Sequence, residues 1–340
     1  MSPTAARLLS PEEIAVRAGG EIAFLRFPER TTVFGEREMR LRQLATGHAM
    51  RDYLLFVAEL ARAQGQVLNA PIEAVLPNAE QIERAAKAGV PLLAATDWQR
   101  DPRWTAILRD VLSRTLERVG EGPARTAMQA LMARSDAWLD PQADRLLGGV
   151  MLGLDVGDAP LVAAGLQVYF THLVIATNAA SDRSRLTPFG RIDDATLCPC
   201  CGSRPTASVT RIGAAESGYR YLACSLCSAQ WHMVRIKCTH CLSTKGITYQ
   251  SVAVAGEGSG TAVEGATTTA RAVEVECCDE CRHYLKILHM ERDPNVEPVA
   301  DDLASLTLDL LTSEAGETRH GANLMLFFGD DEGPPDGGGG

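Results

Sequence analysis

The sequence predicts an α+β protein in which an all-helical N-terminal domain precedes two small cysteine-rich β ribbons, and a C-terminal helix packs back on the helical domain. Three observations predict this class. The chain before Arg191 contains no cysteine and places apolar residues at helical spacing. All ten cysteines lie between Cys198 and Cys281, in a stretch rich in β-branched residues and turns. A leucine-rich segment with helical character follows them.

Changes in composition divide the 340 residues into five parts. We expect the helical domain over residues 1–190, the first ribbon over residues 191–236 and the second ribbon over residues 237–293. A C-terminal helical segment is expected over residues 294–328. Residues 329–340 end in a run of glycines that cannot order itself, so we expect a disordered tail.

Capping residues and glycines divide the helical domain. Ser10, Pro11 and Glu13 supply the N-cap, first-turn proline and N3 glutamate that are typical of a helix start. Apolar residues three and four apart predict the other helices. These cover residues 34–67, 78–89, 101–120, 123–139, 140–147 and 160–180. His48 lies among the apolar positions of the first of them, so we expect a hydrogen-bonded boundary histidine rather than a metal ligand.

The helical domain carries no signature of catalysis or of membrane insertion. It has no glycine-rich nucleotide loop, no nucleophile elbow and no H-E-x-x-H motif. Its longest apolar run, residues 161–177, includes Gln167 and His172, and we expect a core helix there rather than a membrane span. The net charge of −10 disfavours nucleic acid as the main partner, because binding to phosphates depends on Lys and Arg.

Eight of the ten cysteines form four C-x-x-C pairs, each of which can aim two sulfurs at one metal ion. The pairs are Cys198/Cys201, Cys224/Cys227, Cys238/Cys241 and Cys278/Cys281. A tetrahedral zinc or iron ion takes four thiolates, so the pairs predict two closed sites with no open position. Thioredoxin-like redox pairs and disulfide bonds are the other interpretations. Residues 1–10 lack the apolar core of a secretion signal, so we favour metal in a cytoplasmic protein.

Two groupings of the pairs give four sulfurs per metal. In the sequential grouping, the first two pairs form one site and the last two form the other, which gives two consecutive ribbons. In the cross-braced grouping, the first and third pairs share one ion. We favour the sequential grouping, because neighbouring elements usually pair and connections rarely cross.

The remaining cysteines and histidines of this stretch have less definite roles. Cys200 and Cys277 each lie beside a predicted ligand, and each is either a packed free thiol or a reactive one. His232, His240 and His283 are near the ligands in sequence. Because eight thiolates already complete two sites, we expect these histidines to support the ligands or to lie on the surface.

Strands are expected beside the cysteine pairs, where β-branched and aromatic residues gather. They cover residues 207–212, 219–223, 231–236, 247–254 and 283–289. The glycine- and threonine-rich residues 256–269 predict a loop between the third and fourth pairs. The last helix is expected over residues 301–313. The leucines that we expect it to bury are Leu303, Leu306, Leu308, Leu310 and Leu311.

Segments around the cysteine pairs and near the C-terminus carry a family resemblance. They are Cys198 to Ser203, with the C-P-x-C-G form of a rubredoxin knuckle, Tyr221 to Cys227, Trp231 to Arg235, Lys237-Cys238, Cys278 to Cys281, Tyr284 to Lys286, Ala300 to Leu306 and Leu308 to Leu311. With these motifs the chain resembles the FdhE family of formate dehydrogenase accessory proteins, from about residue 20 to residue 328.

The resemblance implies a cytoplasmic, non-enzymatic maturation factor or chaperone with two rubredoxin-like modules. Such a protein is expected to bind the catalytic subunit of respiratory formate dehydrogenase before export. The eight paired cysteines correspond to the family's metal ligands, so we expect two tetrahedral four-cysteine ions, iron with zinc as the alternative. Cys200 is an additional cysteine inside the first knuckle, and the glycine-rich tail lies outside the resemblance.

Two further functions fit the same residues. Iron in these sites would suit an electron-transfer or redox-sensing protein. Zinc ribbons also occur in nucleic-acid binders, but basic and acidic residues are equal in number between Arg191 and Asp293, so no basic stripe supports that function. A homodimer is compatible with the sequence.

Overall fold

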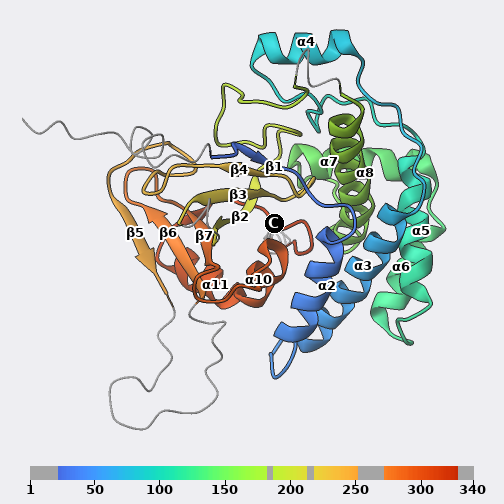
Figure 1. The fold of residues 1–340 in the computed structure, drawn as a ribbon. Coiled ribbons are helices and arrows are strands. Elements are labelled where there is room, and N and C mark those ends of the chain that lie inside the picture. The colour runs from blue at the N-terminus through green and yellow to red at the C-terminus, as the bar shows by residue number, and fades with distance from the viewer. Residues whose placement is uncertain (1–21, 182–186, 213–217, 252–271, 328–340) are drawn as a thin grey trace, which may run out of the picture.

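The computed structural model describes residues 22–181, 187–212, 218–251 and 272–327. The predicted helix start at Ser10, the predicted loop over residues 256–269 and the predicted tail lie outside these described residues. Helices gather on one side of the molecule and a twisted sheet on the other (Figure 1). The structure therefore has the predicted α+β class.

The helical part consists of long helices packed around a shared apolar core (Figure 1). They are α2 (Val33–Leu44), α3 (Arg51–Asn69), α4 (Ala79–Ala88), α5 (Trp104–Leu116), α6 (Pro123–Met132), α7 (Asp136–Gly148) and α8 (Ala159–Ala180). In α4, Asn78 and Gln81 form a capping box and Gly89 ends the helix in the left-handed conformation. The helices predicted over residues 101–120 and 160–180 are recovered as α5 and α8 with ends shifted by up to four residues, which is common for boundaries predicted from sequence.

Two helix boundaries differ from those predicted. Residues 34–67 form two helices, because the chain turns at Gly47, whose φ is +72°. The break expected near residue 140 lies instead before Asp136, and Pro141 sits inside α7. Pro141 has no N–H, so α7 lacks one backbone hydrogen bond, to the Ala137 carbonyl, but the helix continues to Gly148.

Helix α8 forms the centre of the helical part. By length and composition it could cross a membrane, but 83% of its apolar window is buried inside the protein. It packs against α3, α5 and α7. Leu108 of α5 approaches Gly165 so closely that a Cβ there would lie 2.7 Å from the Leu108 Cβ. The run over residues 161–177 is therefore the core helix that we expected.

The strands of the described residues form one mixed sheet that runs through both ribbons. They are β1 (Leu25–Arg26), β2 (Pro205–Thr210), β3 (Arg220–Cys224), β4 (Gln230–His232), β5 (Ile247–Gln250), β6 (Val273–Cys278), β7 (His283–His289) and β8 (Thr318–Arg319). The order is β1-β4-β3-β2-β7-β6-β5, with β8 beside β7. Neighbours are antiparallel except in the parallel pairs β2/β7 and β7/β8. The β2/β7 pair thus joins the two ribbons edge to edge, which the sequence did not predict.

The C-terminal segment forms two helices, α10 (Pro298–Ala304) and α11 (Leu306–Glu314). Helix α10 packs against α2, as predicted (Figure 1). Helix α11 lies against β6 and β8. The predicted burial of Leu310 and Leu311 is wrong, since they are 55% and 49% exposed. The buried face of α11 instead carries Asp309, whose carboxylate pairs with the ammonium of Lys286 on β7.

Buried ion pairs hold α10 to the helical part. Arg40 of α2 pairs with Asp301 and Asp293, with guanidinium-to-carboxylate distances of 2.6 and 2.8 Å. Arg37 of the same helix donates to Glu297 at 3.0 Å. These charges are almost completely buried, so removing one partner would leave an uncompensated charge in the core. The sheet and the helices are therefore fixed relative to each other by specific contacts.

Candidate metal centres

The structure gathers the eight paired cysteines into two groups of four, in the sequential grouping. The first centre is formed by Cys198, Cys201, Cys224 and Cys227. The second centre is formed by Cys238, Cys241, Cys278 and Cys281. Within each group all four Sγ atoms lie within 4.8 Å of one another. Four converging sulfurs are a donor set that suits tetrahedral zinc or iron.

The sulfur pairs that lie within hydrogen-bond distance of each other are farther apart than a disulfide allows. In the first centre, the Sγ atoms of Cys198 and Cys227 are 3.6 Å apart and those of Cys201 and Cys224 are 3.4 Å apart. In the second centre, the Sγ atoms of Cys238 and Cys281 are 3.7 Å apart, and so are those of Cys241 and Cys278. A disulfide bond is about 2.05 Å long. All ten cysteines are described and all are free thiols, so the disulfide interpretation is wrong.

Backbone hydrogen bonds shape the knuckles in the same way at both centres. The Cys198 N–H donates to the Ser203 carbonyl at 3.0 Å, and the Cys238 N–H donates to the Ser243 carbonyl at 2.8 Å. The Cys241 N–H also donates to the Cys238 sulfur at 3.4 Å. Such N–H groups stabilise negative charge on the sulfur that they face. The two centres therefore share one local design.

The residue after the second cysteine of every pair has a positive φ. The four are Gly202 at +74°, Ser228 at +59°, Leu242 at +62° and Arg282 at +58°. The sequence shows only one glycine at these positions, and it gave no other sign of the left-handed turn. For a residue with a side chain this conformation costs about 1–2 kcal/mol. Three of the four knuckles have a residue other than glycine in this conformation, which indicates that surrounding contacts determine the shape of those knuckles.

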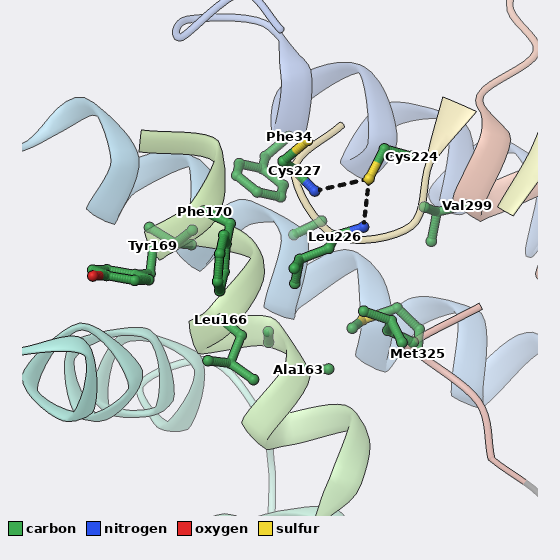
Figure 2. Close-up of a cluster of buried hydrophobic side chains, with 14 of the residues drawn as sticks. Phe34, Ala163, Leu166, Tyr169, Phe170, Cys224, Leu226, Cys227, Val299 and Met325 are labelled. Carbon is green, nitrogen blue, oxygen red and sulfur yellow. Dashed lines mark hydrogen bonds between the residues drawn. The ribbon is translucent and has the colours of Figure 1, made fainter. Parts of the chain in front are cut away.

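The first centre lies inside the main apolar core. Its four cysteines are at most 3% exposed. Figure 2 shows the knuckle of Cys224 and Cys227 with Leu226 directed toward Phe170 of α8, and with Phe34 of α2 beside Cys227. The N–H groups of Leu226 and Cys227 donate to the Cys224 sulfur, both at 3.4 Å. This knuckle is thus a part of the helical core as much as of the sheet.

The loop after α4 holds the other knuckle of the first centre. The Leu93 N–H donates to the Cys200 carbonyl at 3.0 Å, and the Ala95 N–H donates to the Cys201 carbonyl at 2.9 Å. A Cβ on Gly202 would lie 3.3 Å from Cγ of Pro91 in the same loop. Both halves of the first centre are therefore fixed by segments of the helical part.

The second centre lies at the end of the sheet, where β5, β6 and β7 meet the knuckles. Cys238 and Cys278 are buried, but Cys241 is exposed and Cys281 is partly exposed. The neighbouring β5 is also mostly exposed. One side of this centre is therefore open to solvent.

Burial disfavours most of the thiolates in both centres when no cation is present. It raises the pKa of Cys198, Cys224 and Cys227 well above the usual thiol value, because a buried thiolate loses its hydration. Burial likewise raises the pKa of Cys238 and Cys281. Cys201 and Cys241 are the exceptions, because hydrogen bonds with neighbouring groups outweigh burial and lower the pKa of each. A bound divalent ion would supply the compensating charge and displace the thiol protons.

A buried ion pair links the two centres. Arg220 on β3 pairs with Glu276 on β6, and both side chains are at most 3% exposed. Arg220 also donates to the carbonyls of Val234 and Lys237, at 2.9 and 2.7 Å, in the segment that leads to the second centre. The hydroxyl of Tyr249 donates to Glu276 at 2.9 Å. This contact fixes the position of one centre relative to the other.

The two leftover cysteines are buried. Cys277 is 1% exposed, and burial raises its pKa to about 11, which is the opposite of an activated thiol. Cys200 is fully buried beside the first centre but outside its group of four. Burial would raise its pKa, but hydrogen bonds with Cys198 and Cys227 outweigh that effect and lower it to about 7. The packed-thiol interpretation therefore fits Cys277 directly, and complete burial also separates Cys200 from reagents in solvent.

The predicted histidines have different surroundings. His48 is a boundary histidine, as expected: its Nε2 lies 2.9 Å from the Ala304 carbonyl and its Nδ1 accepts from Met50 N–H. His232 contacts the rings of Tyr219 and Tyr221. His240 and His283 come together with Cys281 in a third group of possible ligands. The sequence placed these two histidines near the cysteines but did not predict that they meet.

Comparison with known proteins covers nearly the whole chain. Models of the FdhE N-terminal, central and C-terminal domains match residues 22–186, 197–235 and 236–326. The chain belongs to the FdhE family. The FdhE homolog of Cronobacter sakazakii is 35% identical over 311 residues, which is 91% of this chain and 92% of that protein. The FdhE protein of Salmonella arizonae is 34% identical over 93% of this chain and 95% of its own length.

A solved FdhE structure has the same fold. The crystal structure of the FdhE protein from Pseudomonas aeruginosa matches 90% of this chain and 100% of its own, with a TM-score of 0.76 and 33% identity. FdhE proteins are accessory proteins of formate dehydrogenase rather than catalytic enzymes. The chain is accordingly a formate dehydrogenase accessory protein.

Proposed function

We propose that this FdhE protein promotes maturation of respiratory formate dehydrogenase by binding its catalytic subunit in the cytoplasm before export. The eight paired cysteines, Cys198, Cys201, Cys224, Cys227, Cys238, Cys241, Cys278 and Cys281, hold two metal ions in this proposal. Iron is the expected ion, with zinc as the alternative. The helical part over residues 1–190, the ribbons over residues 191–236 and 237–293, and the segment over residues 294–328 act as one assembly.

The observation that carries this proposal is the pair of four-sulfur groups on a single braced scaffold. Each group is a complete tetrahedral set, so an ion bound there has no open position for a substrate. The sulfurs therefore serve to hold the metal and the fold together. Membership of the FdhE family supports formate dehydrogenase as the proposed client, and the braced scaffold would offer a surface for binding it.

The test is recovery of the client from cells. The full-length chain, carrying an affinity tag, is expressed in anaerobically grown cells that make respiratory formate dehydrogenase and lack their own FdhE protein. We expect the catalytic subunit to copurify and formate dehydrogenase activity to be restored. The same cells without the chain should show neither. Repeated failure to recover the subunit would exclude client binding.

The tagged protein also tests the metal and the oligomeric state. It is purified without oxygen and without added metal, and its metal content and absorption spectrum are measured. Two irons per chain with sulfur-to-iron charge-transfer bands would identify the proposed centres. Two zincs and a featureless visible spectrum would identify the alternative. Light scattering on the same sample distinguishes the monomer from the possible homodimer.

One observation favours electron transfer as a second function. Cys241 is an exposed residue, so the second centre lies at the surface, where a redox partner can approach. If iron is present, a reversible one-electron change at this centre would support the function. An iron-free protein that still restores formate dehydrogenase activity would exclude it.

A further inference from the structure

The third group of possible ligands lies on the open side of the second centre. His240 stands inside the third knuckle, and His283 follows Cys281 by two residues. One nitrogen of each imidazole and the Cys281 sulfur lie within 4.8 Å of one another. His240 is exposed and the other two residues are partly exposed. The three residues therefore lie at the surface of the protein.

The two imidazoles are stacked, with their ring centroids 3.7 Å apart and an angle of 3° between the rings. The Nδ1 atom of His283 lies 2.8 Å from the Cys281 carbonyl oxygen. Because a carbonyl only accepts hydrogen bonds, Nδ1 carries the proton and Nε2 keeps its lone pair. A histidine ligand is commonly oriented by such a bond from its other nitrogen. His283 is thus prepared as a donor through Nε2, and the exposed His240 can turn its ring to join it.

A third histidine supports the cluster from inside the protein. His320 follows β8, is 3% exposed and packs its ring edge against His240, with centroids 5.2 Å apart. Among the described residues, neither of its ring nitrogens makes a hydrogen bond of normal geometry, and only the Thr196 backbone acts on the ring as a weaker hydrogen-bond partner. Buried polar atoms are rarely left in this way unless water or an ion completes the site. The cluster therefore contains a second sign of a ligand that is not protein.

We propose that His240, His283 and Cys281 form a third metal site, open to solvent, for a borderline divalent transition-metal ion such as Zn²⁺. The proposal rests on the ligand role proposed for Cys281, whose thiolate would bridge the second centre and the third site. Imidazole nitrogen together with thiolate sulfur is a donor set typical of zinc. Three protein ligands leave the fourth position to water, which distinguishes this site from the two closed centres.

Charge also favours a cation at this position. A divalent ion with four thiolates carries a net charge of −2, and Cys281 lies on the solvent side of that group. Asp279 and Glu280, both exposed, belong to the same knuckle. The positive charges here are Arg204, which acts on His240 and His320, and Arg282 of the same knuckle, which pairs with Glu317 at 2.9 Å. With Glu317 counted, the bridging thiolate and three carboxylates outnumber these two cations.

The test is a zinc titration of the full-length protein with both closed centres already filled. Protein loaded with Zn²⁺ and desalted should retain two equivalents. Further Zn²⁺ is then added in competition with a chromophoric zinc indicator. We expect a third equivalent to bind at micromolar free zinc. His240→Gln and His283→Gln should each weaken it by at least about tenfold and leave the two retained equivalents in place.

His232→Gln is the matched control, since it changes a partly exposed histidine on β4 of the first ribbon and should leave the third equivalent unchanged. The two retained equivalents report that each variant is folded. Absence of a third equivalent in the unchanged protein overturns the proposal, and so does a third equivalent that both variants keep. Loss of a retained equivalent in either variant also overturns it, because the histidine would then belong to the second centre. Fewer than two retained equivalents in the unchanged protein overturns the closed centres and the third site together, whatever the client-binding result.

Discussion

The two cysteine centres have the same knuckles but different surroundings. Both have the backbone bond from the first cysteine to a serine carbonyl five residues later, and both place a left-handed residue after each pair. The first centre is enclosed by α2, α8 and the loop after α4, whereas the second lies at the end of the sheet with Cys241 in solvent. The comparison indicates that the geometry of the ligands is determined by the knuckle itself. How easily each centre opens is determined by the residues packed around it.

The largest difference between the two centres is expected in the stability of the helical part when one ligand of each centre is removed. Cys227→Ser should abolish metal binding at the first centre and place an unpaired hydroxyl in the core. A structural metal contributes folding energy on the order of 10 kcal/mol, comparable to the stability of a whole domain, so we expect the helical part to unfold with it. Cys241→Ser should remove one ion and lower the helical unfolding midpoint only slightly. Metal analysis and thermal unfolding followed by circular dichroism measure both.

Insoluble Cys227→Ser protein would agree with this expectation, provided that Cys241→Ser remains soluble under the same conditions. Equal losses of helical stability in the two variants would show that the second centre is as deeply coupled to the core as the first.

Removal of metal by a chelator should be biphasic. The second centre should release its ion about a hundredfold faster, which corresponds to a difference of ~3 kcal/mol in the free energy of opening. The reason is that Cys241 and Cys281 can be reached without separating the sheet from the helices. A chromophoric chelator in excess measures the two phases by stopped flow and manual mixing. The Cys241→Ser protein should lack the fast phase, and a single phase in the unchanged protein would contradict the comparison.

Acid should weaken the scaffold of the first centre through His172 on α8. Burial, followed by the charge of Arg30, lowers the pKa of His172 to about 4, below its usual value of about 6.5. Between these values the unfolded chain binds a proton that the folded chain does not. The free energy of unfolding should therefore fall as the pH is lowered from about 6.5 to about 4, with no further loss from this group below. Urea unfolding followed by tryptophan fluorescence measures it.

His172→Gln is the comparison for the acid experiment. Gln can still accept the hydrogen bond that Arg30 donates to Nδ1 at 3.1 Å, but it does not titrate. Protonation of thiolates is common to both proteins, so the difference between their pH profiles isolates His172. Parallel profiles would mean that His172 does not contribute.

The smallest differences in the free energy of unfolding are expected for substitutions at the residues with positive φ that follow the cysteine pairs. Gly202→Ala should lower the free energy of unfolding by about 1–2 kcal/mol, because a Cβ is strained at this φ and lies close to Pro91. Leu242→Gly at the second centre relieves the same strain and loses a partly buried side chain, so the net change should stay within about 1 kcal/mol. Urea midpoints of the metal-loaded proteins decide this. A Leu242→Gly loss as large as that of Gly202→Ala would show that strain is unimportant here.

The sequence predicted those features that a single segment of the chain determines by itself. The capping residues of α4, the strand over residues 283–289 and the four cysteine pairs all belong to this class. The sequence also favoured the sequential grouping of pairs, because neighbouring elements usually pair and connections rarely cross.

Contacts between charged residues that are far apart in the sequence could not be predicted from it. Strand β6 contains Glu274 and Glu276, which argue against a buried strand until their distant partners, Arg292 and Arg220, are in place. Leu310 and Leu311 were assigned to the core by their apolar character, but the buried pairing of Asp309 with Lys286 turns that helix the other way. The exposure of Cys241 likewise depends on what packs nearby and leaves no mark in the C-x-x-C spacing.

The parallel pairing of β2 with β7 has a consequence for synthesis on the ribosome. Ser208 pairs with Ile287, so the edge of β2 has no partner strand until β7 has been made. Until then the nascent first ribbon presents an open strand edge, which other chains can extend. Distant pairings of this kind also form slowly. A translation product that stops before His283 would keep that edge exposed, and we expect it to aggregate or to be degraded even though all four cysteines of the first centre are present.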